Sequence, residues 1–178
     1  MRPFLNLVVP LLLVCWGSAL ARGTYQTPED FLAEAFDGRV PAPRVLWLTG
    51  ARKDTVRRIL GHPYRSLRVR YWLSGARSAW VLEEIGKDQP ITFGVLIEDG
   101  RLARIRVLVF RESRGSEIRH PFFTEQFEGR RLDDELKLDG PIDGISGATL
   151  SVRAMKKIAA LALYLDAEAR KAHVTPSP

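Results

Sequence analysis

The 178-residue chain has a single cysteine, Cys15, and only three histidines. Everything after residue 15 therefore lacks a disulfide, a thiolate metal site, an iron–sulfur cluster and a cysteine nucleophile. The C-x-x-C-H pattern of attached haem is also missing. The histidines, His62, His120 and His173, form no metal-binding spacing with one another or with an acid, so we expect no structural metal.

Charge is almost missing from the first 21 residues, where Arg2 is the only charged side chain. An apolar run over residues 4–16 is followed by small residues up to Ala21, which is typical of a secretory signal peptide. The run is shorter than a membrane-spanning helix usually needs. We expect residues 1–21 to be a cleaved signal peptide and residues 22–178 to form one periplasmic or otherwise extracytoplasmic domain. An uncleaved membrane anchor is the alternative interpretation.

The net charge is positive: 27 Lys and Arg face 21 Asp and Glu, a balance of +6. An exported basic protein can bind an anionic ligand or anionic lipid head groups. No nucleic-acid-binding motif is present, so we expect no nucleic-acid partner.

Alternating and apolar runs predict an α+β fold. Four consecutive strands, from about residue 67 to residue 110, should form an antiparallel meander, with Asp99-Gly100 as a type I′ hairpin turn. The sheet should pack against a C-terminal helix over about 151–173, with smaller helices at the N-terminus, one of them starting at Thr27-Pro28 and another covering 54–60. Residues 22–26 should be a disordered lead. A short helix from Pro121 should turn Phe122, Phe123 and Phe127 inward.

The stretch DGISGATLS, residues 143–151, lies at the start of the predicted C-terminal helix. The plain interpretation is a tight turn in which Thr149 or Ser151 caps the helix. The alternative is an anion site, because a helix N-terminus offers free N–H groups and a positive dipole end. Neither a Walker P-loop nor a Rossmann G-x-G-x-x-G spacing is present.

The same stretch resembles the flavinylation motif of FMN-binding domains: Asp, two variable residues, Ser or Thr, Gly, Ala, Thr, one variable residue, then Ser or Thr. Such domains occur in the FMN-carrying subunits of the Rnf and sodium-pumping NADH:quinone reductase complexes and in small exported relatives. The resemblance implies that Thr149 carries FMN through a phosphoester bond, made from FAD by a separate flavin transferase. It assigns the remaining motif positions to Asp143, Ser146, Gly147, Ala148 and Ser151.

A second motif of this family, Glu-Thr-Pro-Gly after a strand, is matched in part by Glu112-Ser113-Arg114-Gly115. Glu112 and Gly115 carry over as cofactor-site candidates, whereas Ser and Arg replace the family's Thr and Pro. The resemblance covers about residues 90–170, and residues 24–85 match no motif.

The resemblance implies an exported flavoprotein that carries electrons between membrane or periplasmic redox partners and is the substrate of a flavin transferase, rather than an autonomous enzyme. Reduced flavin is anionic, so Arg114 and Arg119 are candidates to stabilise it, whereas the arginines of the strands should be surface charges. Trp47, Trp72 and Trp80 could stack on the ring or belong to the core. Two other functions stay open: a flavin-dependent reductase of a small oxidant, and a non-redox basic envelope module that binds lipid.

Overall fold

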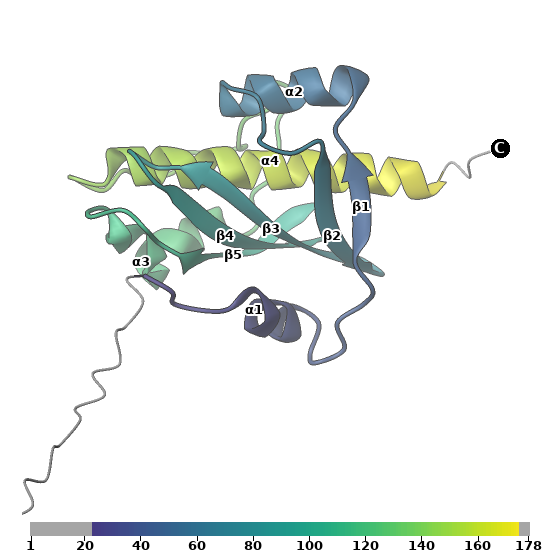
Figure 1. Cartoon of the computed structure of the whole chain (residues 1–178), viewed down its shortest axis with the longest axis horizontal. Coiled ribbons are helices and arrows are strands. Elements are labelled where there is room, and N and C mark those ends of the chain that lie inside the picture. Colours follow the sequence, from purple (N-terminus) through teal and green to yellow (C-terminus); the bar gives the residue numbers. More distant parts are fainter. Residues whose placement is uncertain (1–22, 175–178) are drawn as a thin grey trace, which may run out of the picture.

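The computed structural model describes residues 23–174 and has a five-stranded antiparallel sheet with helices against both of its faces (Figure 1). Each strand pairs with the next along the chain, in the order β1-β2-β3-β4-β5. The strands are β1 (Arg44–Trp47), β2 (Arg68–Ser74), β3 (Arg77–Ile85), β4 (Pro90–Glu98) and β5 (Arg101–Val109). The predicted α+β meander is confirmed.

Helix α4 (Thr149–Val174) lies along one face of the sheet and covers the main core. At 1.5 Å per residue its 26 residues extend about 39 Å. Small and aliphatic side chains at helical spacing, such as Met155, Ile158 and Leu165, are fully buried against the sheet. They meet Trp80 and Leu82 of β3, which are also fully buried.

Helix α1 (Pro28–Ala35) covers part of the opposite face. Thr27 caps it by accepting a hydrogen bond from the Asp30 amide at 3.0 Å, and Pro28 stands in its first turn, as the sequence predicts. Phe31 lies flat on the sheet because Gly94 has no side chain: a Cβ there would come within 2.8 Å of the ring.

Helix α2 (Gly50–Leu60) packs against α4 through Val56 and Leu60 (Figure 1). It begins four residues before the predicted start at Asp54 and ends at Gly61, which takes a left-handed conformation with φ +78°. Three short helical segments follow the sheet: η1 (Ser116–Arg119), α3 (Pro121–Thr124) and η2 (Glu125–Phe127).

Several local predictions are corrected by the structure. Residues 23–26 are ordered: the Tyr25 amide donates to the Leu108 carbonyl at 2.8 Å and the Phe110 amide to the Gly23 carbonyl at 2.6 Å, so this segment runs beside the end of β5. Phe122 is 62% exposed rather than inward, whereas Phe123 and Phe127 are buried. Helix α4 begins at Thr149, two residues earlier than expected.

The turn at Asp99-Gly100 has positive φ at both residues, 51° and 70°, as a type I′ hairpin requires. The predicted signal peptide, residues 1–21, lies outside the described residues. None of the described helices is both long and apolar enough to cross a membrane.

Candidate functional site

The site begins where the chain leaves β5. Glu112 turns back under the loop between β3 and β4, and its Oε1 accepts hydrogen bonds from the amides of Lys87, Asp88 and Gln89 at 2.5, 2.7 and 2.9 Å. Gly86 makes room for this contact, since a Cβ there would come within 2.9 Å of the same oxygen. In an antiparallel meander the β3–β4 loop and the C-terminal end of β5 lie at the same end of the sheet. One carboxylate can therefore hold the loop against the segment that follows β5.

Partial burial alone would raise the pKa of the Glu112 carboxyl, but the three amides favour the charged form and hold the pKa below its ordinary value. Glu112 is therefore ionised at neutral pH and acts as an acceptor that orders the loop. This role is structural, because Glu112 accepts from three backbone amides.

Gly115 joins this loop to helix α4. Its φ of +88° lies in the left-handed region, and a Cβ built there would stand 2.5 Å from the Ser151 Oγ and 3.5 Å from the Ala148 Cα. Ser151 and Ala148 are themselves buried. The glycine therefore allows the segment after β5 to lie directly against the first turn of α4.

The N-terminus of α4 has an unusual cap. The Ala148 carbonyl accepts the first helical hydrogen bond, from the Val152 amide at 2.9 Å, so Ala148 occupies the cap position. The plain sequence interpretation, in which Thr149 or Ser151 caps the helix, is therefore wrong, because both lie inside the first turn. An alanine side chain has no acceptor to offer the free amides.

Within the described part of the chain, no hydrogen bond reaches the amides of residues 149–151. These N–H groups, together with the positive end of the helix dipole, favour an anion at this position. Gly147, with φ +83°, precedes the cap and keeps the approach open. Thr149 is exposed at the first helical position, with its hydroxyl next to the free amides.

These pieces surround one hollow of about 570 Å³. Its lining joins three segments: the β3–β4 loop, the segment after β5 and the start of α4. The lining residues are Lys87, Glu112, Ser113, Arg114, Gly147, Ala148, Thr149, Leu150 and Ser151.

The structure brings together six of the eight predicted site residues: Glu112, Gly147, Ala148, Thr149 and Ser151 line the hollow, and Gly115 packs behind Ser151. Asp143 and Ser146 do not line it. Both are exposed on the turn before the helix, where the Asp143 amide donates to Gln126 Oε1 at 2.8 Å.

The sequence reasoning missed Lys87, Ser113 and Leu150 as lining residues. Lys87 was detectable in principle, since the meander places its loop at the same edge as Glu112. Of the arginines considered for the flavin, Arg114 lines the hollow and Arg119 does not. Trp47, Trp72 and Trp80 do not line it either, and Trp80 is fully buried in the core.

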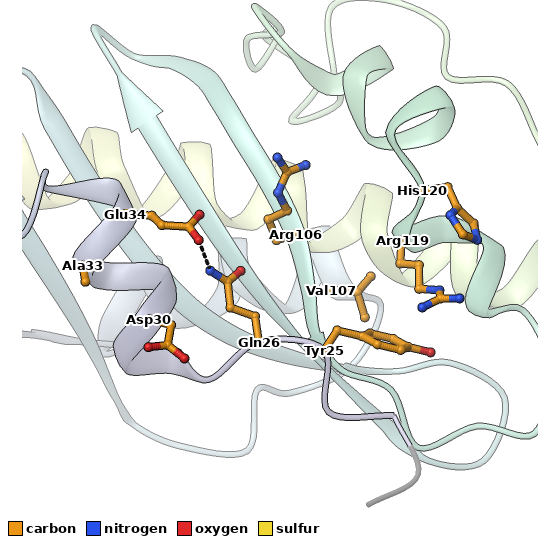
Figure 2. Close-up of a pocket in the computed structure, with 9 residues that line it drawn as sticks. All are labelled: Tyr25, Gln26, Asp30, Ala33, Glu34, Arg106, Val107, Arg119 and His120. Atoms are coloured by element: carbon orange, nitrogen blue, oxygen red, sulfur yellow. Dashed lines mark hydrogen bonds between the residues drawn. The ribbon is translucent and has the colours of Figure 1, made fainter. Parts of the chain in front are cut away.

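A larger hollow, of about 670 Å³, opens on the α1 side of the sheet (Figure 2). Asp30 and Glu34 of α1 lie on one side of it, and Arg119 and His120 on the other. Glu34 accepts a hydrogen bond from Gln26 at 2.9 Å. This hollow contains none of the motif residues, so size alone does not identify the functional site.

The arrangement around Thr149 can be compared with known families. Residues 86–164 match the sequence model of the FMN-binding domain. The match covers 79 of the 178 residues, which is less than half of the chain. The match supports FMN as the cofactor and covers β4, β5, the loop of Glu112 and most of α4. No curated protein matches the chain.

The residues around this hollow fit the phosphate end of FMN. Free amides, a helix dipole and the two cations Lys87 and Arg114 meet at one hollow, and an alanine at the cap leaves the amides available to an anion. A hydroxyl-bearing side chain, Thr149, stands at the same place. Among the described residues there is no cluster of His, Cys, Asp and Glu able to hold a metal ion.

Proposed function

We propose that this protein is an exported flavoprotein in which FMN is attached to Thr149 through a phosphoester bond and which carries electrons between redox partners. The observation that carries the proposal is the position of Thr149. It is the first residue of α4, it is exposed, and it lines the one hollow that contains the free helix amides.

The attachment balances as a transfer from FAD. The Thr149 Oγ forms a bond to the flavin-side phosphorus, the phosphoanhydride bond breaks, and AMP leaves. A threonine hydroxyl is a weak nucleophile that needs a base to take its proton. We assign the base, and any metal, to a separate flavin transferase.

The exposed turn before α4 suits recognition by such a transferase. Asp143 and Ser146 are solvent-exposed, and they lie outside the hollow that the cofactor would fill. Their side chains are therefore available to another protein. We assign them to maturation rather than to holding the flavin.

When bound, FMN supplies reversible one- or two-electron chemistry. The chain contributes position and charge: the α4 amides hold the phosphate, and Lys87 and Arg114 place positive charge beside the hollow. Positive charge near a reduced flavin stabilises its anionic form. The partners are expected to be redox proteins, with a membrane-bound donor or acceptor as the first candidate.

Intact-protein mass after denaturation tests the attachment. The chain is produced together with an active flavin transferase, as wild type and as Thr149→Ala. The wild type should gain the mass of one FMN less one water, because a covalent ester survives denaturation, and Thr149→Ala should show no gain.

The matched control is Thr49→Ala, since Thr49 is likewise a threonine at the start of a helix, at the cap position of α2, and its side chain makes no capping hydrogen bond. This variant should carry the full adduct. Thr149→Ser should keep part of the adduct because it retains the hydroxyl. A wild type without added mass, made beside a transferase proven active on another substrate, would show that attachment at Thr149 is wrong.

The alternatives give different results with the loaded protein. The flavin of a carrier is reduced and oxidised by partner proteins, and it reacts little with small oxidants alone. A reductase turns over a small oxidant without any partner. A non-redox envelope module stays colourless and tolerates Thr149→Ala without loss of function.

A further inference from the structure

On the α1 side of the sheet, the part formed by β1 and β2 is not covered by a helix. In β2, Trp72 packs with the α1 cluster, whereas Val69 and Tyr71 belong to the core under α4. Because side chains alternate along a strand, Arg68 and Arg70 point to the α1 side. In β1, Trp47 lies opposite Arg68 and Val45 opposite Arg70, so these four residues share one surface, called here the β1–β2 face.

Helix α1 contacts β3 and β4 and does not extend over this surface. As a result Val45 and Trp47 are 46% and 54% exposed. The Arg68 guanidinium lies 5.8 Å from the centre of the Trp47 ring. The face thus combines two exposed apolar side chains with two arginines, one of which lies over the Trp47 ring.

The charge of the surrounding segment is strongly one-sided. Residues 39–82, which hold β1, α2 and β2, contain ten Lys and Arg and a single acid, Asp54, whereas the whole chain has 27 basic and 21 acidic residues. Among the described residues only Arg52 and Arg77 of these ten form ion pairs with acids. The other eight are exposed, so this end of the molecule has a concentrated positive field.

A hollow of about 360 Å³ lies on the β1–β2 face, lined by Val45, Ser66, Arg68 and Arg70. Two guanidinium groups without acidic partners therefore border a space open to solvent. Arginine forks match the geometry of phosphate oxygens. The hollow suits a phosphate group presented from outside.

We infer that the β1–β2 face docks this protein on an anionic lipid surface, with Arg68 and Arg70 against lipid phosphates and Trp47 at the level of the head groups. Tryptophan favours that interface because one end of its ring system is apolar and the other polar. Clusters of basic residues bind anionic membranes through the surface potential. An acidic protein would satisfy the charges, but it gives no reason for Val45 and Trp47 to be exposed beside them.

The docking face and the flavin site lie at opposite ends of the molecule. The β1–β2 face is near the C-terminal end of α4, where Tyr71 of β2 contacts His173 at 3.0 Å, whereas Thr149 is the first residue of that helix (Figure 1). The length of α4 separates them. Docking therefore leaves the hollow at Thr149 free for a partner.

Vesicle binding tests the inference, with the full chain and vesicles of phosphatidylcholine alone or mixed with phosphatidylglycerol. Because the apolar residues 4–16 would bind either vesicle, the readout is the ratio of affinities for anionic and neutral vesicles. Arg68→Gln combined with Arg70→Gln should lower binding to anionic vesicles about 30-fold, since each surface cation contributes about fivefold, and leave neutral binding unchanged. The preference should weaken as salt is raised.

The matched control is Arg101→Gln combined with Arg131→Gln, which removes the same charge outside residues 39–82 and should lower binding far less. Anionic vesicles should also shift the tryptophan fluorescence of wild type to the blue, and Trp47→Phe should reduce that shift. Thr149→Ala should bind like wild type, so a failure of flavin attachment is distinguishable from a failure of docking. Equal loss in both arginine pairs, or no preference for anionic vesicles in wild type, would overturn the inference.

Discussion

Gly115 shows at the scale of one residue how the loop after β5 is fitted to α4. Gly115→Ala places a methyl group 2.5 Å from the Ser151 Oγ at a backbone φ of +88°. We expect it to lower the free energy of unfolding by about 1–3 kcal/mol, from steric contact and left-handed strain together. Chemical denaturation of the two proteins measures this, and flavin loading should fall as well because the first turn of α4 is displaced.

A double-mutant cycle separates the steric contact with Ser151 from the backbone strain as causes of this loss of stability. Ser151→Ala removes the clashing oxygen, so the pair Gly115→Ala with Ser151→Ala should be more stable than the sum of the single effects predicts. The strain at φ +88° stays in both backgrounds. Strict additivity would mean that the contact with Ser151 is unimportant and that strain alone sets the cost.

The individual residues of the site were predictable only where a motif names them. Thr149, Ala148 and Gly147 follow from the pattern of small residues before a helix. The cap at Ala148 was not foreseen, because capping preferences favour a hydroxyl and place the helix start at Thr149 or Ser151. Lys87 was missed because it lies more than 60 residues before Thr149 in the sequence. Only the meander brings its loop to Glu112 and so to the hollow.

At the scale of elements, a buried carboxylate ties the loop after α2 to the sheet and to α4. Glu84 of β3 is buried and accepts from His62 Nε2 at 3.0 Å and from the Lys157 ammonium of α4 at 3.2 Å. His62 Nδ1 lies 3.0 Å from the Pro63 carbonyl, so both ring nitrogens have acceptors and the protonated ring suits the site.

This contact predicts a pH dependence of stability. The hydrogen bond to Glu84, followed by that to the Pro63 carbonyl, raises the pKa of His62 above 6.5. A raised pKa in the folded state contributes stability that is fully present below pH 6.5 and is lost as the pH rises through the folded-state pKa. The free energy of unfolding should therefore fall across that window, and His62→Gln should remove this part of the fall.

His120→Gln is the matched control, because His120 is exposed and forms no ion pair among the described residues. Its profile of unfolding free energy against pH should follow the wild type. A wild-type slope that persists in His62→Gln would assign the pH dependence to other groups.

Elements were predicted best where one periodicity dominates. The four long strands and the C-terminal helix follow from their alternating and helical patterns. Strand β1 is not among the predicted strands, because four residues carry too little alternation to identify a strand. The order of residues 23–26 was not predictable from the local sequence, because it comes from hydrogen bonds to the end of β5.

At the scale of the whole molecule, the N-terminal elements and the segment that matches the FMN-binding domain share one core. Strand β3 pairs with β4 along its full length, and the stacked rings of Tyr71 and Trp80, 4.9 Å apart, lie under α4. The Arg170 guanidinium of α4 pairs with Asp166 and donates to the Ala76 carbonyl at 2.6 Å. The hairpin between β2 and β3 is thereby bound to the end of the helix.

A fragment of residues 86–178 should therefore not fold alone, although it contains the whole family match. It lacks residues 23–85, which supply eight buried side chains to the main core: Leu46, Leu48, Val56, Leu60, Val69, Tyr71, Trp80 and Leu82. Each is worth about 1.5–3 kcal/mol, so together they contribute about 12–24 kcal/mol, which is as large as or larger than the ~5–15 kcal/mol by which a domain is stable. Circular dichroism and amide dispersion by NMR measure the outcome.

The chain from residue 23 onward is the control, and it should unfold in one transition seen alike in the far-ultraviolet signal of the helices and in the environment of Trp80. A folded fragment 86–178 would mean that β1–β3 form a separable addition. If the fragment is unfolded, residues 24–85 have two roles at once. Their inner side chains complete the core that holds α4 and Thr149 in place, and their outer side chains are left free to form the basic β1–β2 face.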